Sequence, residues 1–170
     1  IDEALHALAE KGERARIVAG ATDLILEIER GVRKGIEILI DVTRIPRLDQ
    51  ISIDEDDVIH LGPLVTHNHC VESRLIRARA YPLARAAWEV GAPQIRNRGT
   101  VGGSLAHADP AAEWTALALA LDAECDIAGP SGTRTVTARD FLVSTFMTAL
   151  EPDELLTAVR MRVPNGRTGS

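Results

Sequence analysis

The stretch QIRNRGTVGGSLAHADPAAEW, Gln94–Trp114, gives the strongest structural signals in this sequence. It places Gly99, Gly102 and Gly103 among hydroxyl residues and then sets Asp109 before Pro110. Glycine allows positive φ angles and lets a ligand approach the backbone closely. Aspartate followed by proline is a preferred helix start. The pattern therefore predicts a ligand-holding loop followed by a long helix, AAEWTALALAL.

The first fifty residues predict a βαβ unit. A helix over residues 2–10 ends at Gly12, and the buried strand ARIVAG follows it. Thr22-Asp23 then offers a cap for the helix LILEIERG, which ends at Gly31. The run IEILIDVT is a second strand, so the order is strand, glycine turn, helix, strand. We expect a right-handed crossover between parallel strands.

The remainder of the chain is predicted to contain both strands and helices. Two short strands flank an acidic turn, Asp54–Asp57, and helices are predicted at 66–76 and 82–90. A hairpin surrounds Pro130-Ser131-Gly132, and DELLTAVRMRV is a late strand. The sequence therefore predicts an α+β protein of two subdomains, residues 1–50 and 51–170.

Composition excludes several classes of protein. The chain has 170 residues, of which 45% are hydrophobic, and this is enough for a core and argues against disorder and coiled coil. Its net charge of −6 argues against nucleic-acid and anionic-membrane partners.

Cysteine usage and targeting signals bear on location. Cys70 and Cys125 show no CxxC spacing, which favours a reducing cytoplasm. No apolar run reaches the roughly 20 residues of a membrane span, and no signal peptide is evident. The chain begins without methionine, so we expect a fragment or the ordered part of a longer protein.

Two glycine turns occupy matching places, VAGATDL after the first strand and GTVGGSL before the Ala/Leu helix. Backbone N–H groups in such turns can converge on a phosphate. Neither turn has a lysine, so a P-loop is excluded, and the GxGxxG fingerprint is absent. The first turn alone is also consistent with a plain strand-to-helix connection, but the two turns together favour an anion site.

The segments IVAGATDL, IRNRGTVGGSLAHADPAAE and LEPDELLTAVRMRVP together resemble the FAD-binding subunit or domain of molybdenum hydroxylases. That group includes xanthine dehydrogenase, the flavoprotein of aerobic carbon monoxide dehydrogenase (its medium subunit) and nicotinate-type hydroxylases. The resemblance covers nearly the whole chain. It implies a two-subdomain FAD-binding fold of the vanillyl-alcohol-oxidase/PCMH type, with FAD between the subdomains.

The resemblance also implies cofactor contacts at particular positions. Glu113 stands where the family usually has an aspartate, and Ala21 replaces a common glycine. The family chain continues past this C-terminus into further flavin contacts and a separate domain. The implied FAD-binding residues are Ile17, Val18, Ala19, Gly20, Ala21, Thr22, Asp23, Leu24, Val90, Thr100, Val101, Gly102, Gly103, Ser104, Glu113 and Leu156.

The implied role is electron transfer within an oxidoreductase complex. A molybdopterin subunit would hydroxylate the substrate, an iron–sulfur subunit would relay electrons, and FAD here would pass them to an external acceptor. The full-length protein is then expected to be part of a hetero-oligomer, without catalytic acid–base or metal-binding residues on this chain. Two alternatives stay open: a stand-alone flavin oxidase of the same fold, and a non-catalytic fragment whose glycine loops serve packing.

For three further groups of residues, a structural role is an alternative to a functional one. The run His67-Asn68-His69-Cys70 resembles a metal cluster, but surface or capping roles fit it better. His107 would either face the flavin or pack within its loop. Arg96 and Arg98 would contact FAD phosphates or a partner subunit, or remain solvated.

Overall fold

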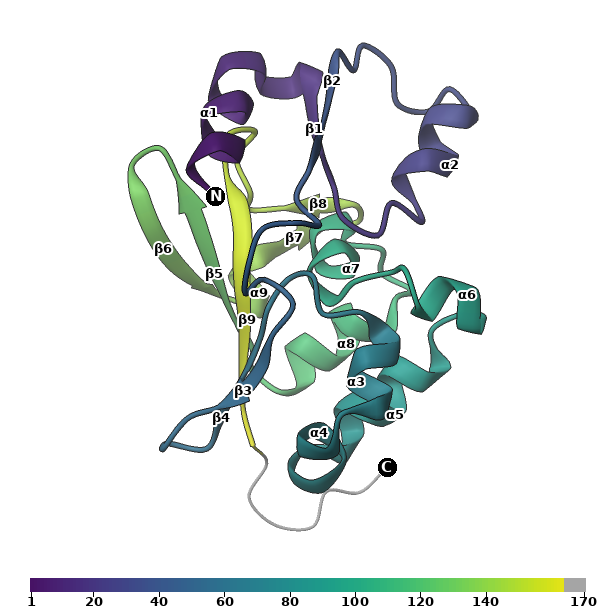
Figure 1. Ribbon diagram of the computed structural model, residues 1–170, viewed down its shortest axis with the longest axis vertical. Helices are drawn as coiled ribbons and strands as arrows, with labels where there is room; N and C mark the ends of the chain where they lie inside the picture. The colour runs from purple at the N-terminus through teal and green to yellow at the C-terminus, as the bar shows by residue number, and fades with distance from the viewer. Residues whose placement is uncertain (164–170) are drawn as a thin grey trace.

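The computed structural model describes residues 1–163 (Figure 1) and confirms the predicted α+β composition. A 3₁₀ turn at Gly12–Arg14 follows the first helix. The helices are α1 (Asp2–Lys11), α2 (Leu24–Glu29), α3 (His67–Glu72), α4 (Arg74–Arg79), α5 (Tyr81–Glu89), α6 (Pro93–Arg96), α7 (Val101–His107), α8 (Glu113–Ala120) and α9 (Ala138–Phe141). The strands are β1 (Ala15–Val18), β2 (Ile38–Asp41), β3 (Ile51–Ile53), β4 (Val58–Leu61), β5 (Glu124–Gly129), β6 (Gly132–Thr137), β7 (Leu142–Ser144), β8 (Met147–Thr148) and β9 (Leu155–Arg162).

The N-terminal unit has the predicted order of strand, helix and parallel strand, and the hand of its crossover stays a prediction. Strands β1 and β2 pair in parallel, with Ala15 opposite Ile38, and α2 lies between them in the chain. Helix α1 ends at Gly12, whose φ of 54° suits glycine. A small core beside this unit consists of Ala4, Val42, Leu48 and Leu64. The division into subdomains at residue 50 stays a prediction, although the two main sheets fall on either side of it.

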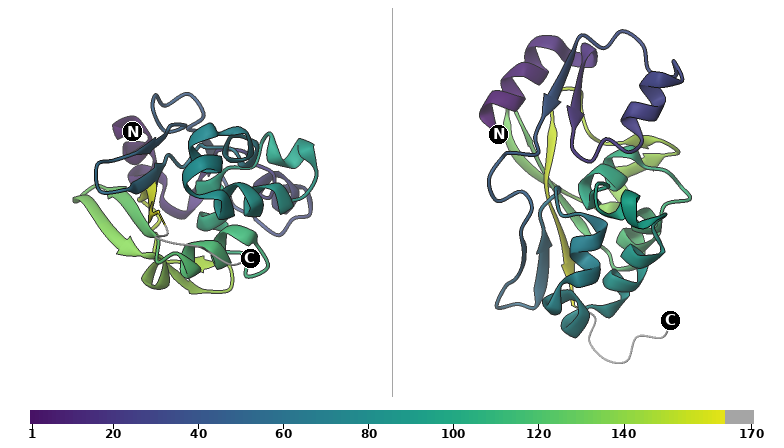
Figure 2. Two further views of the ribbon diagram at one scale, coloured as in Figure 1. Left: turned by 90° about the horizontal axis from the view of Figure 1, so that it is seen from below. Right: turned by 45° about the vertical axis from the view of Figure 1, so that its right-hand side comes forward.

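The second sheet has five antiparallel strands in the order β3-β4-β9-β5-β6. The long strand β9 lies at its centre, and the predicted hairpins form β3-β4 and β5-β6 on its two sides. Helices α3, α4, α5, α7 and α8 cover one face of this sheet (Figures 1 and 2). The separate hairpin β7-β8 lies near the end of α7.

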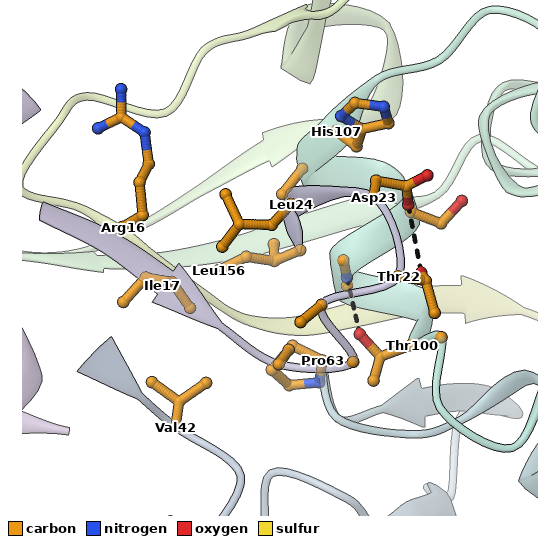
Figure 3. Close-up of a pocket in the computed structure, with 18 of the residues that line it drawn as sticks. Arg16, Ile17, Thr22, Asp23, Leu24, Val42, Pro63, Thr100, His107 and Leu156 are labelled. Carbon is orange, nitrogen blue, oxygen red and sulfur yellow. Dashed lines mark hydrogen bonds between the residues drawn. The ribbon is translucent and has the colours of Figure 1, made fainter. Parts of the chain in front are cut away.

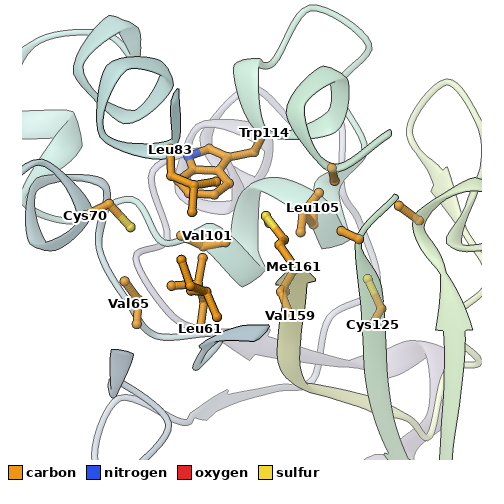
Figure 4. Packing of buried hydrophobic residues seen from close by; sticks show 14 of the residues in the cluster. Leu61, Val65, Cys70, Leu83, Val101, Leu105, Trp114, Cys125, Val159 and Met161 are labelled. Atoms are coloured by element: carbon orange, nitrogen blue, oxygen red, sulfur yellow. The ribbon is translucent and has the colours of Figure 1, made fainter. Parts of the chain in front are cut away.

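The main core lies between these helices and the sheet (Figure 4). Trp114 of α8 is fully buried and packs in the same cluster as Leu83 of α5 and Leu105 of α7. On the sheet side, the cluster includes Val159 and Met161 of β9, Leu61 of β4 and Cys125 of β5. This packing fixes α7 and α8 against the central strand, which positions the segments described below.

The helix predicted over 66–76 is in fact two helices. Ser73 has extended backbone angles, φ −62° and ψ 118°, and it separates α3 from α4. Its hydroxyl accepts a hydrogen bond from the Ile76 N–H at 3.3 Å, and Thr66 caps α3 in the same way through the His69 N–H. Serine favours such caps over helix interiors, so the local break follows from the residue type.

Two predictions about the stretch 94–114 are wrong. The segment expected as a glycine loop is the first turn of α7, because the Thr100 hydroxyl caps it by accepting the Gly103 N–H at 3.0 Å. The next helix, α8, begins at Glu113 and not at Asp109. The Asp109 carboxylate instead accepts the Ala111 N–H at 2.9 Å, which forms a turn before the helix.

Candidate functional site

A cleft of about 590 Å³ separates the turn after β1 from helix α7. We call residues Ala19–Asp23 the β1–α2 turn. Figure 3 shows Thr22 of this turn near Thr100 at the start of α7 and Asp23 near His107 at the end of that helix, and Leu156 of β9 also lines the cleft. The loop Thr148–Leu155 completes the lining. A volume of this size is typical of small-molecule and cofactor sites.

The two glycine segments meet at the base of the cleft. A Cβ on Gly20 would lie 2.1 Å from the Arg98 carbonyl oxygen and 2.9 Å from the Gly99 Cα. A Cβ on Gly102 would lie 2.4 Å from a side-chain atom of Pro63. These two glycines are therefore required by contact between protein segments. Gly103 is different, because it is exposed at the cleft and its Cβ would meet only the Thr100 hydroxyl.

The β1–α2 turn carries free hydrogen-bond donors. Within residues 1–163, the backbone N–H groups of Ala19–Asp23 donate to no protein acceptor. Ala21 adopts φ 60°, a left-handed conformation that is unusual for a residue other than glycine. Left-handed residues in such turns direct successive N–H groups to one side, where they bind anions. This turn is the part of the cleft best suited to a phosphate group.

The start of α7 offers a different kind of surface. The N–H groups of Val101 and Gly102 donate to the carbonyls of Val65 and Pro63, at 2.9 and 3.0 Å. Those of Gly103 and Ser104 both donate to oxygens of Thr100. The expectation that these residues present N–H groups to a ligand is therefore wrong. Gly103 instead contributes bare backbone, and the hydroxyls of Thr100 and Ser104 lie in the cleft wall.

The charges around the cleft are mostly acidic. Asp23, Glu27, Asp109, Glu113, Glu151 and Glu154 line it, against Arg16 and Arg33. Arg33 is paired with Glu27, and Arg16 donates to the carbonyls of Glu13 and Ala15. An anion would therefore be held by local N–H dipoles more than by cationic side chains.

A salt bridge fixes one edge of the cleft. The Arg134 guanidinium donates to both carboxylate oxygens of Glu154, at 2.8 and 2.6 Å, and to the Ala149 carbonyl. The hydrogen bond from Arg134 is the main cause that lowers the pKa of Glu154. The Glu154 carboxylate also accepts the Glu151 N–H at 2.9 Å, so the loop before β9 is tied at several points.

Most of the residues implied by the resemblance lie in the cleft wall. Val18 and Val101 do not: Val18 pairs with β2, and Val101 is fully buried in the main core. Glu113 lines the cleft from the first turn of α8. The wall includes Ile17, Ala19, Gly20, Ala21, Thr22, Asp23, Leu24, Val90, Thr100, Gly102, Gly103, Ser104, Glu113 and Leu156.

Sequence reasoning misplaced His67 and Arg96. His67 is neither a surface nor a capping residue, because it is buried in the cleft wall and its Nδ1 accepts the Trp114 Nε1–H at 2.9 Å. Arg96 is buried and donates to the carbonyls of Trp88, Val90 and Gly91 at the end of α5, so it holds that helix end. The role of His67 depends on a long-range contact with Trp114, 47 residues away, whereas that of Arg96 depends on carbonyls five to eight residues earlier, which no helix or strand pattern indicates.

His107 and Arg98 show two other outcomes. His107 lines the cleft and packs against Phe146 of a distant segment, with ring centroids 5.0 Å apart, so a contact with the flavin stays a prediction. The Arg98 side chain is exposed. Among residues 1–163, no three His, Cys, Asp or Glu side chains are placed to hold a metal ion. None of the helices in that range is both long and apolar enough to cross a membrane.

The donors and dimensions of the cleft fit FAD. A free N–H turn suits the pyrophosphate, bare glycine at position 103 permits close approach, and apolar Ile17, Leu24 and Leu156 suit ring systems. The fit rests on residues of this chain alone.

Similar proteins belong to molybdenum-containing dehydrogenases and hydroxylases. The carbon monoxide dehydrogenase medium chain of Hydrogenophaga pseudoflava is 37% identical over 164 residues, which cover 96% of this chain and 56% of that one. The nicotine 6-hydroxylase medium subunit of Paenarthrobacter nicotinovorans is 36% identical, over 94% of this chain and 56% of that one. This chain therefore spans about half the length of these relatives.

Solved structures agree with the sequence comparison. Quinoline 2-oxidoreductase from Pseudomonas putida 86 superposes with a TM-score of 0.93 at 32% identity, covering 97% of this chain and 57% of that chain. The likeness supports the expected FAD-binding fold of the vanillyl-alcohol-oxidase/PCMH type. The family model described as the FAD binding domain in molybdopterin dehydrogenase matches residues 1–165. The chain belongs to this family of FAD-binding domains.

Proposed function

We propose that this domain binds FAD in the cleft and transfers electrons within a molybdenum hydroxylase complex. The main support for this proposal is the β1–α2 turn. Its N–H groups donate to no protein acceptor among the described residues, and its residues line a cleft large enough for a cofactor. The pyrophosphate would lie on this turn, against the bare backbone of Gly103. Family membership supports FAD as the occupant.

The proposed role of the chain is to bind and orient the cofactor. FAD when bound supplies one-electron and two-electron redox chemistry. The protein's residues hold its phosphates through backbone dipoles, offer hydroxyl groups from Thr100 and Ser104, and exclude water with Ile17, Leu24 and Leu156. This role requires no acid or base step from the residues of the cleft.

The proposed partners are an iron–sulfur subunit, which would deliver electrons, and a molybdopterin subunit, which would hydroxylate the substrate. An external acceptor would then take the electrons from FAD. The support is that the similar proteins are medium subunits of such enzymes. The buried thiols Cys70 and Cys125 agree with a reducing compartment, and we place the complex in the cytoplasm. Iron and molybdenum should copurify with the native protein, whereas a stand-alone flavin oxidase would lack them.

A cleft-filling variant tests FAD binding directly. Gly103→Leu puts a side chain into the cleft without the backbone collision expected at Gly102. We expect FAD affinity, measured by calorimetric titration of the full chain, to fall roughly a hundredfold, about 2.7 kcal/mol.

The matched control is Thr100→Ala. A Cβ at position 103 would lie 2.8 Å from the Thr100 hydroxyl, so Gly103→Leu also disturbs this cap. Thr100→Ala removes the cap, at about 1 kcal/mol of stability, together with one hydroxyl of the cleft wall, but it adds no bulk to the cleft, so its FAD affinity should fall much less than that of Gly103→Leu. Unchanged affinity in the folded Gly103→Leu protein would contradict the proposed site.

A further inference from the structure

The side chain of His67 is buried in the wall of the cleft. His67 is the first residue of α3, and its exposed fraction is 3%. It lies near the β1–α2 turn, since the Asp23 carboxylate is one of two charges that act on its imidazole. The other is the Arg96 guanidinium. The imidazole therefore lies close to the β1–α2 turn and among the residues that line the cleft.

Trp114 determines which ring nitrogen of His67 carries the proton. The Trp114 indole N–H can only donate, and it lies 2.9 Å from His67 Nδ1. The two rings are also stacked, with an interplanar angle of 25°. Burial lowers the pKa of His67 to about 4, so the imidazole is neutral at ordinary pH. In a neutral imidazole whose Nδ1 accepts, Nε2 must carry the hydrogen.

The Nε2–H group of His67 has no acceptor within residues 1–163. Its edge of the ring faces Gly99, where a Cβ would lie only 2.8 Å from Nε2. Gly99 in turn contacts Gly20 of the β1–α2 turn. Because Nε2 is not among the fully buried side-chain atoms that lack a partner, it is in contact with open space, and His67 lines the cleft. This donor opens into the cleft next to the free N–H groups of the turn.

We infer that His67 Nε2–H donates a hydrogen bond to a pyrophosphate oxygen of the bound dinucleotide. The inference rests on the proposed function and adds a side-chain donor to the backbone donors of the turn. A phosphate group is the ligand chemistry that fits, because it offers only acceptors and can take hydrogen bonds from several directions. Trp114 acts as a positioning residue, since it holds the imidazole in the donating tautomer.

Comparison of two ligands separates this role from a structural one. We expect His67→Phe, which removes the donor and keeps a ring, to weaken FAD binding roughly tenfold to a hundredfold in fluorescence titrations of the full chain. Riboflavin, which lacks phosphate, should bind the variant and the unaltered protein equally. Equal FAD affinity, or an equal loss with riboflavin, would overturn the inference.

A second measurement needs no variant. In the unaltered protein with ¹⁵N-labelled histidine, the ring N–H resonance of His67 should shift downfield and exchange more slowly once FAD is added. The ³¹P resonances of bound FAD should differ between the unaltered protein and His67→Phe. A His67 resonance that FAD leaves unchanged would refute the hydrogen bond. If the unaltered protein fails to bind FAD at all, the proposed function itself fails.

Discussion

The backbone conformation of a single residue, Ala21, shapes the β1–α2 turn of the cleft and strains the chain there. Alanine in a left-handed conformation is strained, because its Cβ crowds the following carbonyl. Its place in the free N–H turn indicates that the strain serves the geometry of the site. Glycine at the same position would keep the geometry without the strain.

Ala21→Gly should therefore stabilise the protein. Relief of strain outweighs the added freedom of glycine in the unfolded chain, and we expect a net gain of about 1 kcal/mol. For a domain of this size the unfolding midpoint should rise by roughly 2–4 °C. Ala116→Gly, in the middle of α8, is the control and should lose about 1 kcal/mol. If Ala21→Gly instead lowers the free energy of unfolding, the proposed strain at Ala21 is contradicted.

His67 should make stability depend on pH. Its pKa is about 4 in the folded protein and 6.5 in the unfolded chain, so the unfolded chain binds more protons between these values. Stability is then lost as pH falls through this window, by about 2 kcal/mol between pH 7 and pH 5. Urea unfolding at the two pH values measures this loss.

His67→Gln is the matched variant for that measurement. Its amide oxygen can accept the Trp114 N–H, and it does not titrate. The difference between pH 7 and pH 5 should shrink by the same amount in this variant. An unchanged difference would assign the pH dependence to other groups.

At the scale of elements, side chains placed at helix ends decide where helices begin and stop. Thr66, Ser73, Thr100 and Thr137 each accept a backbone N–H at a helix start. The end of α5 is held differently, by a buried guanidinium. Arg96 donates to three carbonyls and lies over the Trp88 ring at 4.6 Å.

Arg96→Ala should destabilise the fold by about 2–4 kcal/mol, because it leaves carbonyls at the end of α5 unpaired and opens a buried space. Arg98→Ala is the matched control, since Arg98 is an exposed arginine two residues away. We expect the control to change stability by no more than about 0.5 kcal/mol. Denaturant unfolding measures both, and similar effects would contradict the capping role of Arg96.

Local sequence patterns predicted the strands of the N-terminal sheet and of the five-stranded sheet, but they missed the hairpin β7-β8 and the helices of the stretch 94–114. Alternating and apolar runs gave β1, β2 and both hairpins of the five-stranded sheet, since these follow from residue type and turn chemistry. Helix α7 was missed because Gly102 and Gly103 disfavour helix on propensity alone. It forms because Val65 and Pro63 supply carbonyls from a distant segment. For the same reason, local patterns could not predict the hydrogen bond between Trp114 and His67, which lie 47 residues apart.

At the scale of the whole molecule, the cleft lies between the N-terminal sheet and the helices and five-stranded sheet that follow it, and these two parts have cores of unequal size. The core beside the N-terminal sheet has four buried residues, whereas the main core extends over helices α3–α5, α7 and α8 and the five-stranded sheet. Helix α2 has no buried residue at all among its six. The cofactor would contact both parts, so its binding should stabilise chiefly the weaker one.

Hydrogen exchange should reveal this difference. Without FAD, amides of β1 and β2 should exchange faster than those of β9, and saturating FAD should slow the exchange of β1 and β2 most. Mass spectrometry of exchanged peptides measures both, and peptides from β9 serve as the internal control. Equal protection of the two sheets before FAD is added would contradict the unequal packing.

The contact between Gly20 and Arg98-Gly99 has a kinetic consequence. It joins segments far apart in the chain. Forming the contact therefore requires closure of a long loop, which lowers the conformational entropy of the chain. Local helices and the hairpins β3-β4 and β5-β6 need no such closure. We therefore expect the junction under the cleft to form late in folding, after the local helices and hairpins, so that the polypeptide can bind its cofactor only once this contact is made.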